Sequence, residues 1–264
     1  MKKLILVVGI LTQSYFGISQ KIEIINSKPL PVLSGNGLGS DIRFGVVSLT
    51  HDNNYIYGLS TNPSNYIIRY NPKTLEVIDA LISDLPKATY KEIRGNKIPN
   101  GITYDGKYLW VAYAAKQKIY KLNKYSGKIL DSIPGPPCIE LYHRYDGFDF
   151  DGENFWLIRN NWNGGVDLFK LSKSGKILNQ KKIDNAYSLG LHHSSKNLWT
   201  VLHDVDKSLT LNKYSTSDSL FTESYHISWD IGIPNGITIF GKYIYFSTGS
   251  VGTRKIHKIK LVKE

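Results

Sequence analysis

Three side chains with oxygen donors recur at one position of a repeated pattern in this 264-residue chain. Asn100 and Asn235 each stand in the hexapeptide Ile-Pro-Asn-Gly-Ile-Thr, and Asp146 precedes a glycine in a third copy. Two weaker copies have Val47 and Leu189 at this position. Amide and carboxylate oxygens are the ligands that Ca²⁺ prefers. If the fold places the three side chains around one axis, they predict a site for Ca²⁺ or another divalent cation.

An aromatic residue closes each copy of the pattern. These residues are Tyr57, Trp110, Trp156, Trp199 and Tyr245, with spacings of 53, 46, 43 and 46 residues. Apolar residues alternate with period two inside each copy, and Gly, Asn and Asp separate the runs, which is typical of strands and turns. Units of about 40 to 50 residues with four strands are typical of propeller blades. The sequence therefore predicts an all-β fold, a five-bladed β-propeller with four-stranded blades and the tryptophans packed between them.

The two ends of the chain complement each other in this scheme. Lys21 to Ile25 alternates like a strand but has no blade of its own, and the last copy of the repeat ends one strand short. We therefore expect the N-terminal strand to complete the last blade, so that residues 20–264 form one domain. A closed ring leaves no open sheet edges at its seam.

Residues 1–19 have the pattern of a secretory signal peptide. Lys2 and Lys3 precede an apolar run from Leu4 to Leu11, and small residues follow. That run is too short to span a membrane, and no second apolar run follows it. The sequence predicts a secreted or periplasmic protein without a transmembrane segment. Cys138 is the only cysteine, which excludes an intramolecular disulfide and a thiolate metal cluster.

The formal net charge of the chain is +11 at pH 7. Many lysines stand in the repeated turns, so we expect a basic rim around the disk. Such a rim keeps a protein soluble, and it also attracts anionic polysaccharides or an anionic cell surface. Export makes nucleic acid a poor partner, and we predict none.

Long, dissimilar loops are expected on one face of the disk, and short, similar turns on the other. Function usually resides in variable loops on a rigid framework. The variable-loop face carries the candidate ligand-binding residues Tyr142, His143, Arg144, Trp162 and Trp229, which suit a sugar or a peptide.

A second column of polar residues stands three positions after the first. Its members are Thr50, Thr103, Asp149, His192 and Thr238. We expect a hydrogen-bonded ring inside the disk. Asp149 and His192 also have the residue types of an acid-base pair across neighbouring blades.

Two families resemble parts of this sequence. Pro99-Asn100-Gly101-Ile102, and Asp146-Gly147 followed by Asp151-Gly152 and Trp156, resemble the Pro-Asn-Gly and Asp-Gly motifs of the gluconolactonase and regucalcin family. That resemblance implies a divalent cation on Asn100 and Asp146, with Asp146 as the catalytic base of lactone hydrolysis. The family has six blades and a further glutamate ligand, where this sequence predicts five blades and has Val46-Val47.

The second resemblance is confined to one hairpin. Phe246-Ser-Thr-Gly-Ser-Val-Gly252 and the following Lys255 to Ile259 are similar to a segment of the plant-type glutaminyl cyclases, which are secreted five-bladed propellers.

Three hypotheses of function follow. The first is a ligand site at a polar channel mouth on the variable-loop face, with hydrolysis of a lactone or ester assisted by a cation on Asn100, Asp146 and Asn235. The second is a non-catalytic propeller that binds a small molecule, a glycan, a peptide or a protein. The third is an enzyme like the glutaminyl cyclases.

Overall fold

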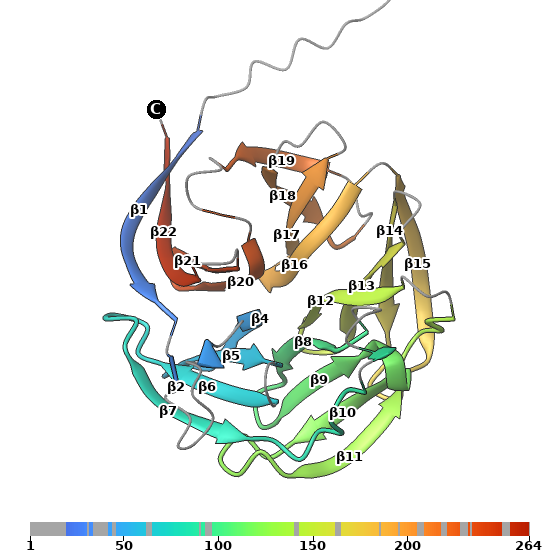
Figure 1. Cartoon of the computed structure of the whole chain (residues 1–264). Coiled ribbons are helices and arrows are strands. Elements are labelled where there is room, and N and C mark those ends of the chain that lie inside the picture. The colour runs from blue at the N-terminus through green and yellow to red at the C-terminus, as the bar shows by residue number, and fades with distance from the viewer. Residues whose placement is uncertain are drawn as a thin grey trace, which may run out of the picture.

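The computed structural model describes most of the chain as strands (Figure 1). It covers residues 20–30, 32–33, 42–43, 46–61, 65–89, 91–92, 97–139, 143–161, 165–184, 186–194, 196–204, 209–217, 221–227, 232, 234–249 and 254–263. The predicted signal peptide lies outside these residues. No helix in the described part of the chain is long and apolar enough to cross a membrane.

The described strands form five four-stranded antiparallel sheets and one two-stranded sheet. Blade one contains β4 (Val46–His51), β5 (Ile56–Ser60), β6 (Tyr66–Tyr70) and β7 (Val77–Ile82). Blade two contains β8 (Pro99–Tyr104), β9 (Leu109–Tyr113), β10 (Lys118–Leu122) and β11 (Ile129–Pro134), with the short helix η1 (Ala114–Lys116) after β9. Blade three contains β12 (Arg144–Phe150), β13 (Phe155–Asn161), β14 (Gly165–Leu171) and β15 (Ile177–Asp184).

Blade four contains β16 (Ala186–Ser194), β17 (Asn197–Asp204), β18 (Leu209–Ser215) and β19 (Phe221–His226). Blade five contains β20 (Pro234–Phe240), β21 (Tyr243–Thr248), β22 (Lys255–Lys263) and β1 (Gln20–Pro29). The small sheet pairs β2 (Val32–Leu33) with β3 (Ile42–Arg43). The prediction of a five-bladed propeller with four-stranded blades is confirmed.

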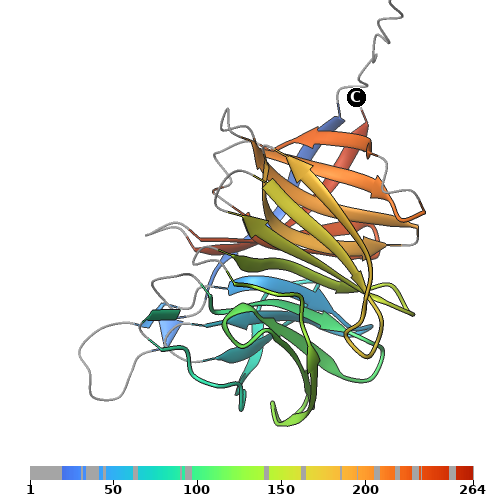
Figure 2. The same ribbon diagram turned by 90° about the vertical axis from the view of Figure 1, so that its right-hand side faces the viewer.

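The N-terminal strand closes the ring, as predicted. β1 pairs antiparallel with β22, from Gln20 opposite Lys263 to Pro29 opposite Lys255. The two strands lie side by side in both views of the molecule (Figures 1 and 2). The first and last parts of the domain are therefore held together by sheet hydrogen bonds.

The first strand of each blade lines the centre of the ring (Figure 1). β4, β8, β12, β16 and β20 each contact the next one around the axis. Glycines allow this close approach: a Cβ on Gly101 would come within 2.5 Å of the Phe148 Cβ, and one on Gly147 within 2.6 Å of the Leu191 Cβ. The glycine of the repeated motif is therefore a packing requirement at the axis.

All five inner strands carry a β-bulge at the same repeat position. The pairing register shifts between Pro99 and Gly101, between Tyr145 and Gly147, and at the equivalent places in β4, β16 and β20. The extra residue of a bulge is left out of the ladder, and the bulge turns its side chain to a new direction. The candidate positions Asn100, Asp146 and Asn235 are such extra residues.

Aspartates cap the turns between the first and second strands in three blades. In blade two, Asp105 Oδ1 accepts hydrogen bonds from the Lys107 and Tyr108 amides, and its Oδ2 accepts one from Trp110 Nε1 at 2.7 Å. Asp151 bonds in the same way to its turn and to Trp156 Nε1 at 2.7 Å. This pattern explains the Asp-Gly motif as turn chemistry that also fixes the aromatic residue of the repeat.

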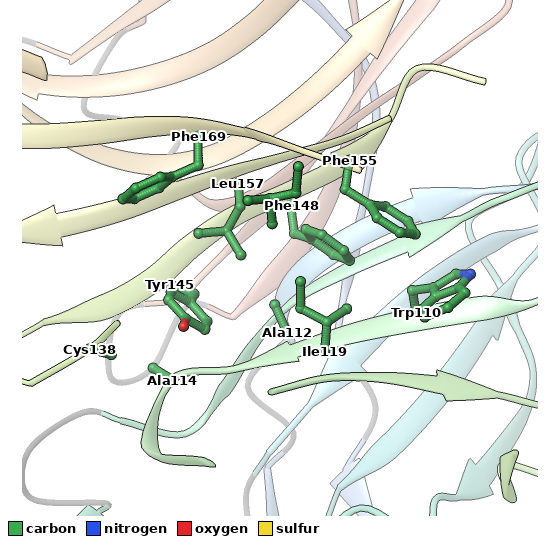
Figure 3. Close-up of a cluster of buried hydrophobic side chains, with 11 residues drawn as sticks. Trp110, Ala112, Ala114, Ile119, Cys138, Tyr145, Phe148, Phe155, Leu157 and Phe169 are labelled. Atoms are coloured by element: carbon green, nitrogen blue, oxygen red, sulfur yellow. The ribbon is translucent and has the colours of Figure 1, made fainter. Parts of the chain in front are cut away.

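The core lies between adjacent blades. Between blades two and three, Trp110, Phe148 and Phe155 pack together in a buried cluster that also contains Tyr145 and Cys138 (Figure 3). Trp110 and Trp156 are buried, as predicted, and Trp199 is partly buried in the cluster between blades four and five. These clusters hold the inner strands rigidly, so the side chains at the axis have fixed positions.

Candidate functional site

Asn100 and Asp146 are in direct contact at the axis. Asn100, from β8, donates its amide Nδ2 to Asp146 Oδ1, and Arg144 and Asn160 donate to Asp146 Oδ2. Asp146 is only 4% exposed. The bulges in β8 and β12 explain the contact, since each releases its extra residue from the ladder beside the neighbouring blade.

Asn160 connects this network to the next blade. Its Nδ2 also donates to the Ser188 carbonyl at 2.7 Å, and its Oδ1 accepts from the Ser188 amide at 2.9 Å. The network therefore spans blades two, three and four. Asn160 was not among the predicted site residues, because it lies in a second strand and not at the repeat position of the inner strands.

Burial raises the pKa of Asp146 above its ordinary value, while the Arg144 guanidinium and the amides of Asn160 and Asn100 act in the opposite direction. Arg144 uses its Nε for the ion pair with Asp146, and its side chain is 27% exposed. In the described part of the chain, its two terminal amino groups have no hydrogen-bond partner. The guanidinium is therefore fixed at Nε by Asp146, while part of the Arg144 side chain is exposed to solvent.

Asn235 is on an inner strand that does not adjoin those of the other two predicted ligands. It is in β20, which packs between β4 and β16 in the ring. Its amide rests on the end of its own blade, where a Cβ on Gly249 would come within 2.1 Å of Nδ2. No hydrogen bond among the described residues connects it to Asn100 or Asp146.

This arrangement is a poor fit for a divalent cation. Both carboxylate oxygens of Asp146 already accept hydrogen bonds, and one of them does so from the positively charged Arg144 guanidinium, which repels a cation. The Asn100 Oδ1 atom is the feature that favours a ligand, because it is buried and has no partner among the described residues. The cation site stays a prediction.

The other predicted ligand-binding residues divide into two groups. Tyr142, Trp162 and Trp229 lie outside the described residues. His143 is described and is only 8% exposed, and its backbone carbonyl accepts a hydrogen bond from Cys138 Sγ at 2.8 Å. Among the predicted binding residues that the structure describes, Arg144 has the more exposed side chain.

The second polar column forms a buried network on the short-turn face. Asp149 Oδ2 lies 2.8 Å from His192 Nδ1, and Asp149 Oδ1 accepts from Thr103 Oγ1 at 2.5 Å. His51, which follows Thr50 of the column, places its Nδ1 3.0 Å from Thr238 Oγ1. The prediction of a hydrogen-bonded ring inside the disk is confirmed for these members.

A pocket of ≈ 340 Å³ opens beside this network. Its lining comes from four blades and includes Thr50, His51, Tyr104, Asp149, His192 and His193. Sequence analysis identified Asp149 and His192 but missed His51, since the equivalent residues in the other blades are mostly large and apolar. A search for histidines adjacent to the polar column would have found it.

The surroundings of Asp149 and His51 lower the pKa of both groups. Burial would raise the pKa of Asp149, but the His192 imidazole, the Thr103 hydroxyl and the His193 amide together hold it below its ordinary value. Burial lowers the pKa of His51 to about 4, and nearby His192 acts in the same direction. His51 is therefore neutral, and Asp149 is ionised, at neutral pH.

Comparison with known proteins supports the fold and nothing narrower. No family profile and no curated protein matches the chain in sequence. The glutaminyl cyclase of Myxococcus xanthus has a similar structure, with a TM-score of 0.64 and 9% identity over 93% of this chain and 98% of that one. A tail fibre of Staphylococcus aureus phage P68 has a TM-score of 0.52 and 14% identity, over 90% of this chain and 53% of that one. At such identities the likeness is one of fold.

Proposed function

We propose that this protein binds a small carboxylate-bearing saccharide at the axial mouth of the variable-loop face, with Arg144 as the anchor. The supporting observation is the Arg144 guanidinium, which is held through Nε by buried Asp146 while its terminal amino groups have no partner among the described residues. A carboxylate accepts two parallel hydrogen bonds from such a group. The ion pair with Asp146 reduces the freedom of the guanidinium before the ligand arrives.

Charge and composition favour an acidic ligand. The chain has a formal net charge of +11, and a positive surface raises the local concentration of anions. Tyr142, Trp162 and Trp229 are predicted to lie near Arg144, and aromatic rings suit stacking on the apolar face of a sugar. The predicted signal peptide would take the protein to the compartment where acidic polysaccharides occur.

The test compares trigalacturonate with its methyl ester, which has the same rings and no charge. Binding is measured by titration calorimetry on wild-type protein and on Arg144→Gln. We expect the acid to bind more tightly than the ester, and Arg144→Gln to weaken acid binding about 10- to 100-fold, since charged hydrogen bonds are worth about 1.5 to 3 kcal/mol.

Arg69→Gln is the matched control. Arg69 also pairs with an aspartate, Asp79, but on the outer strands of blade one. The Arg69→Gln variant should bind trigalacturonate with the affinity of the wild type. Equal binding of acid and ester, or wild-type affinity in Arg144→Gln, would disprove the proposal.

Cation-assisted hydrolysis of a lactone or ester is a second candidate, favoured by the unpartnered Asn100 Oδ1. Asn100, Asp146 and Asn235 would be the ligands, with Asp146 as base. If it is correct, calcium should raise the Tm of the wild type, and Asp146→Ala should abolish the rise, because a ligand that binds only the folded state stabilises it. Identical melting curves with calcium and with chelator would end this candidate.

An activity like that of glutaminyl cyclases is the third candidate. The observation that favours it is the likeness to the Myxococcus xanthus enzyme, together with the Ser-Thr-Gly segment that begins at Ser247. Release of ammonia from a peptide with an N-terminal glutamine would be its signature. If no ammonia forms in this assay, the protein does not have a glutaminyl cyclase activity on that peptide.

A further inference from the structure

The pocket on the short-turn face combines a base and a hydrogen-bond donor that the proposed function does not use. Its polar groups come from different blades, with Asp149 from β12, His192 from β16 and His51 from β4, and buried Thr238 from β20 contacts both histidines behind them. The inner strands that carry them pack directly against one another. The geometry is thus built into the rigid centre of the ring and not into a loop.

The hydrogen bonds define which nitrogen of each imidazole faces the pocket. Asp149 is ionised and can only accept, so His192 donates through Nδ1, and in the neutral ring the lone pair is then on Nε2. Thr238 lies 3.5 Å from His192 Nδ1 and 3.0 Å from His51 Nδ1. With His192 Nδ1 as a donor, the Thr238 hydroxyl is free to donate to His51 Nδ1, which leaves the proton of neutral His51 on Nε2.

Both histidines line the pocket, and their Nε2 atoms are the ring nitrogens left for a ligand. Neither makes a hydrogen bond with any residue that the structure describes, and neither is a buried atom without a partner. The two rings lie side by side with their centroids 5.5 Å apart. One ring therefore presents a basic nitrogen, and the adjacent ring presents an N–H donor.

We propose that this pocket is a proton-transfer site for small α-hydroxy carbonyl compounds, with His192 as the base and His51 as the donor to the carbonyl oxygen. Asp149 is a positioning residue, because it orients His192 and stabilises the charge that His192 gains. A neutral imidazole polarises a carbonyl without giving up its proton, which suits the His51 position.

The step is balanced without a co-reactant. His192 Nε2 takes the proton from the carbon next to the carbonyl, and the electrons of that C–H bond form the C=C bond of an enolate. The carbonyl π electrons move to oxygen, which accepts the hydrogen bond from His51 Nε2–H. Return of a proton or a solvent deuteron from His192 to the same carbon re-forms the C–H or C–D bond and the carbonyl, which completes an exchange. No oxidant, nucleophile or cofactor is consumed.

The surrounding charges leave one carboxylate uncompensated in the site, which disfavours an anionic ligand. Asp52 at the pocket edge is paired with Lys124 Nζ at 2.8 Å, whereas Asp149 is hydrogen-bonded to His192, which is neutral when it acts as the base. His193 also lines the pocket, and its amide donates to Asp149 Oδ2 at 2.5 Å. The pocket therefore favours an uncharged, hydroxylated compound, and its volume of ≈ 340 Å³ limits the size to a small molecule.

The test is hydrogen–deuterium exchange of dihydroxyacetone and D-glyceraldehyde in D₂O, followed by proton NMR. Wild-type protein should speed loss of the α-proton signal above the buffer rate. His192→Gln should reduce the enzymatic rate at least 100-fold, since a positioned base contributes about 10²- to 10⁴-fold. His51→Gln should reduce it less, because the glutamine amide still offers an N–H. His226→Gln, at an exposed position in β19, should exchange like the wild type.

A second variant separates catalysis from folding. His192→Ala should regain exchange when imidazole is added, whereas a variant that had merely lost its structure would not. Exchange at the buffer rate in the wild type, or equal rates in wild type and His192→Gln, would overturn the proposal. The residues involved lie at the opposite end of the inner strands from Arg144, so this result is independent of the saccharide-binding test.

Discussion

Two histidines, half-buried His51 and buried His257, make the stability of this protein depend on pH. Burial lowers the pKa of both His51 and His257 from 6.5 to about 4. His257 contacts Ser27 Oγ at 2.7 Å and Thr248 Oγ1 at 3.1 Å, and it is 3% exposed. Between pH 6.5 and 4 the unfolded chain therefore binds more protons than the folded one, and protonation favours unfolding.

We expect the free energy of unfolding to fall as the pH drops through this window. Each histidine should contribute a slope of about 1.4 kcal/mol per pH unit, and His257→Gln should remove one of the two contributions. Urea unfolding at a series of pH values measures the slope. His226→Gln changes an exposed histidine and should leave the slope as in the wild type. A slope unaffected by His257→Gln would contradict this prediction.

Sequence analysis placed Asn100 and Asp146 together because both precede a glycine at the same repeat position. It could not show that Arg144 and Asn160 both donate hydrogen bonds to the Asp146 carboxylate. Asn160 belongs to the second strand of its blade, and the bulge at Asp146 changes which residues face each other across the pair. Hydrogen-bond satisfaction of a buried carboxylate depends on such register details, which a repeat pattern does not contain.

At the level of strands, the repeated glycine is required by packing. A Cβ on Gly147 would come within 2.6 Å of the Leu191 Cβ and within 2.9 Å of the Leu191 amide nitrogen, which belong to the adjacent inner strand. Backbone at this place has no room to move, because the inner strands contact one another all around the axis. The motif that resembles a metal-binding sequence thus has a structural explanation as well.

Gly147→Ala should destabilise the fold by about 1 to 3 kcal/mol, the usual cost of overpacking. Gly106→Asn is the comparison. Gly106 has a φ of +95° and no atom within 4 Å of a built Cβ, and asparagine tolerates the left-handed region. The asparagine side chain of Gly106→Asn should therefore lower the free energy of unfolding less than the single methyl group of Gly147→Ala does. Chemical denaturation of both variants decides the order, and a reversed order would refute the packing argument.

A lysine on the third strand lies over the closing aromatic in four blades. The distances from Nζ to the ring centroid are 5.5 Å for Lys121 and Trp110, 5.3 Å for Lys170 and Trp156, 5.5 Å for Lys213 and Trp199, and 5.9 Å for Lys258 and Tyr245. Some of the lysines that the sequence analysis assigned to a basic rim therefore also make cation–π contacts with the aromatic rings of the repeat. The alternating pattern predicted the strands, but not these cross-strand partners.

For the whole molecule, the count of blades and the closure of the ring were predictable from the sequence. The repeat defines five units, and the last unit lacks a strand that the N-terminal segment provides. The sequence pointed to Asp149 and His192 as an acid-base pair, but the pocket beside them was not predictable, because His51 lies outside the repeat positions that were compared. The short turns are alike in sequence, yet the inner strands bring unlike polar residues together beneath them.

Removal of β1 should open the ring. A variant that begins at residue 31 would expose the whole edge of β22, and an unpaired edge strand promotes association. We expect a lower Tm and dimers or larger species in size-exclusion chromatography. The control begins at residue 20 and keeps β1, so it should stay monodisperse. A variant without β1 that melts like this control would show that closure is not needed for stability.

The register of β1 on β22 also determines how the protein responds to mechanical load. Gln20 lies opposite Lys263, so the two chain ends emerge at the same end of one antiparallel strand pair. A force that draws the ends apart acts on one rung of that pair at a time instead of shearing all rungs together. Tension applied at the termini would peel the seam open at low force while the other four blades keep their shape.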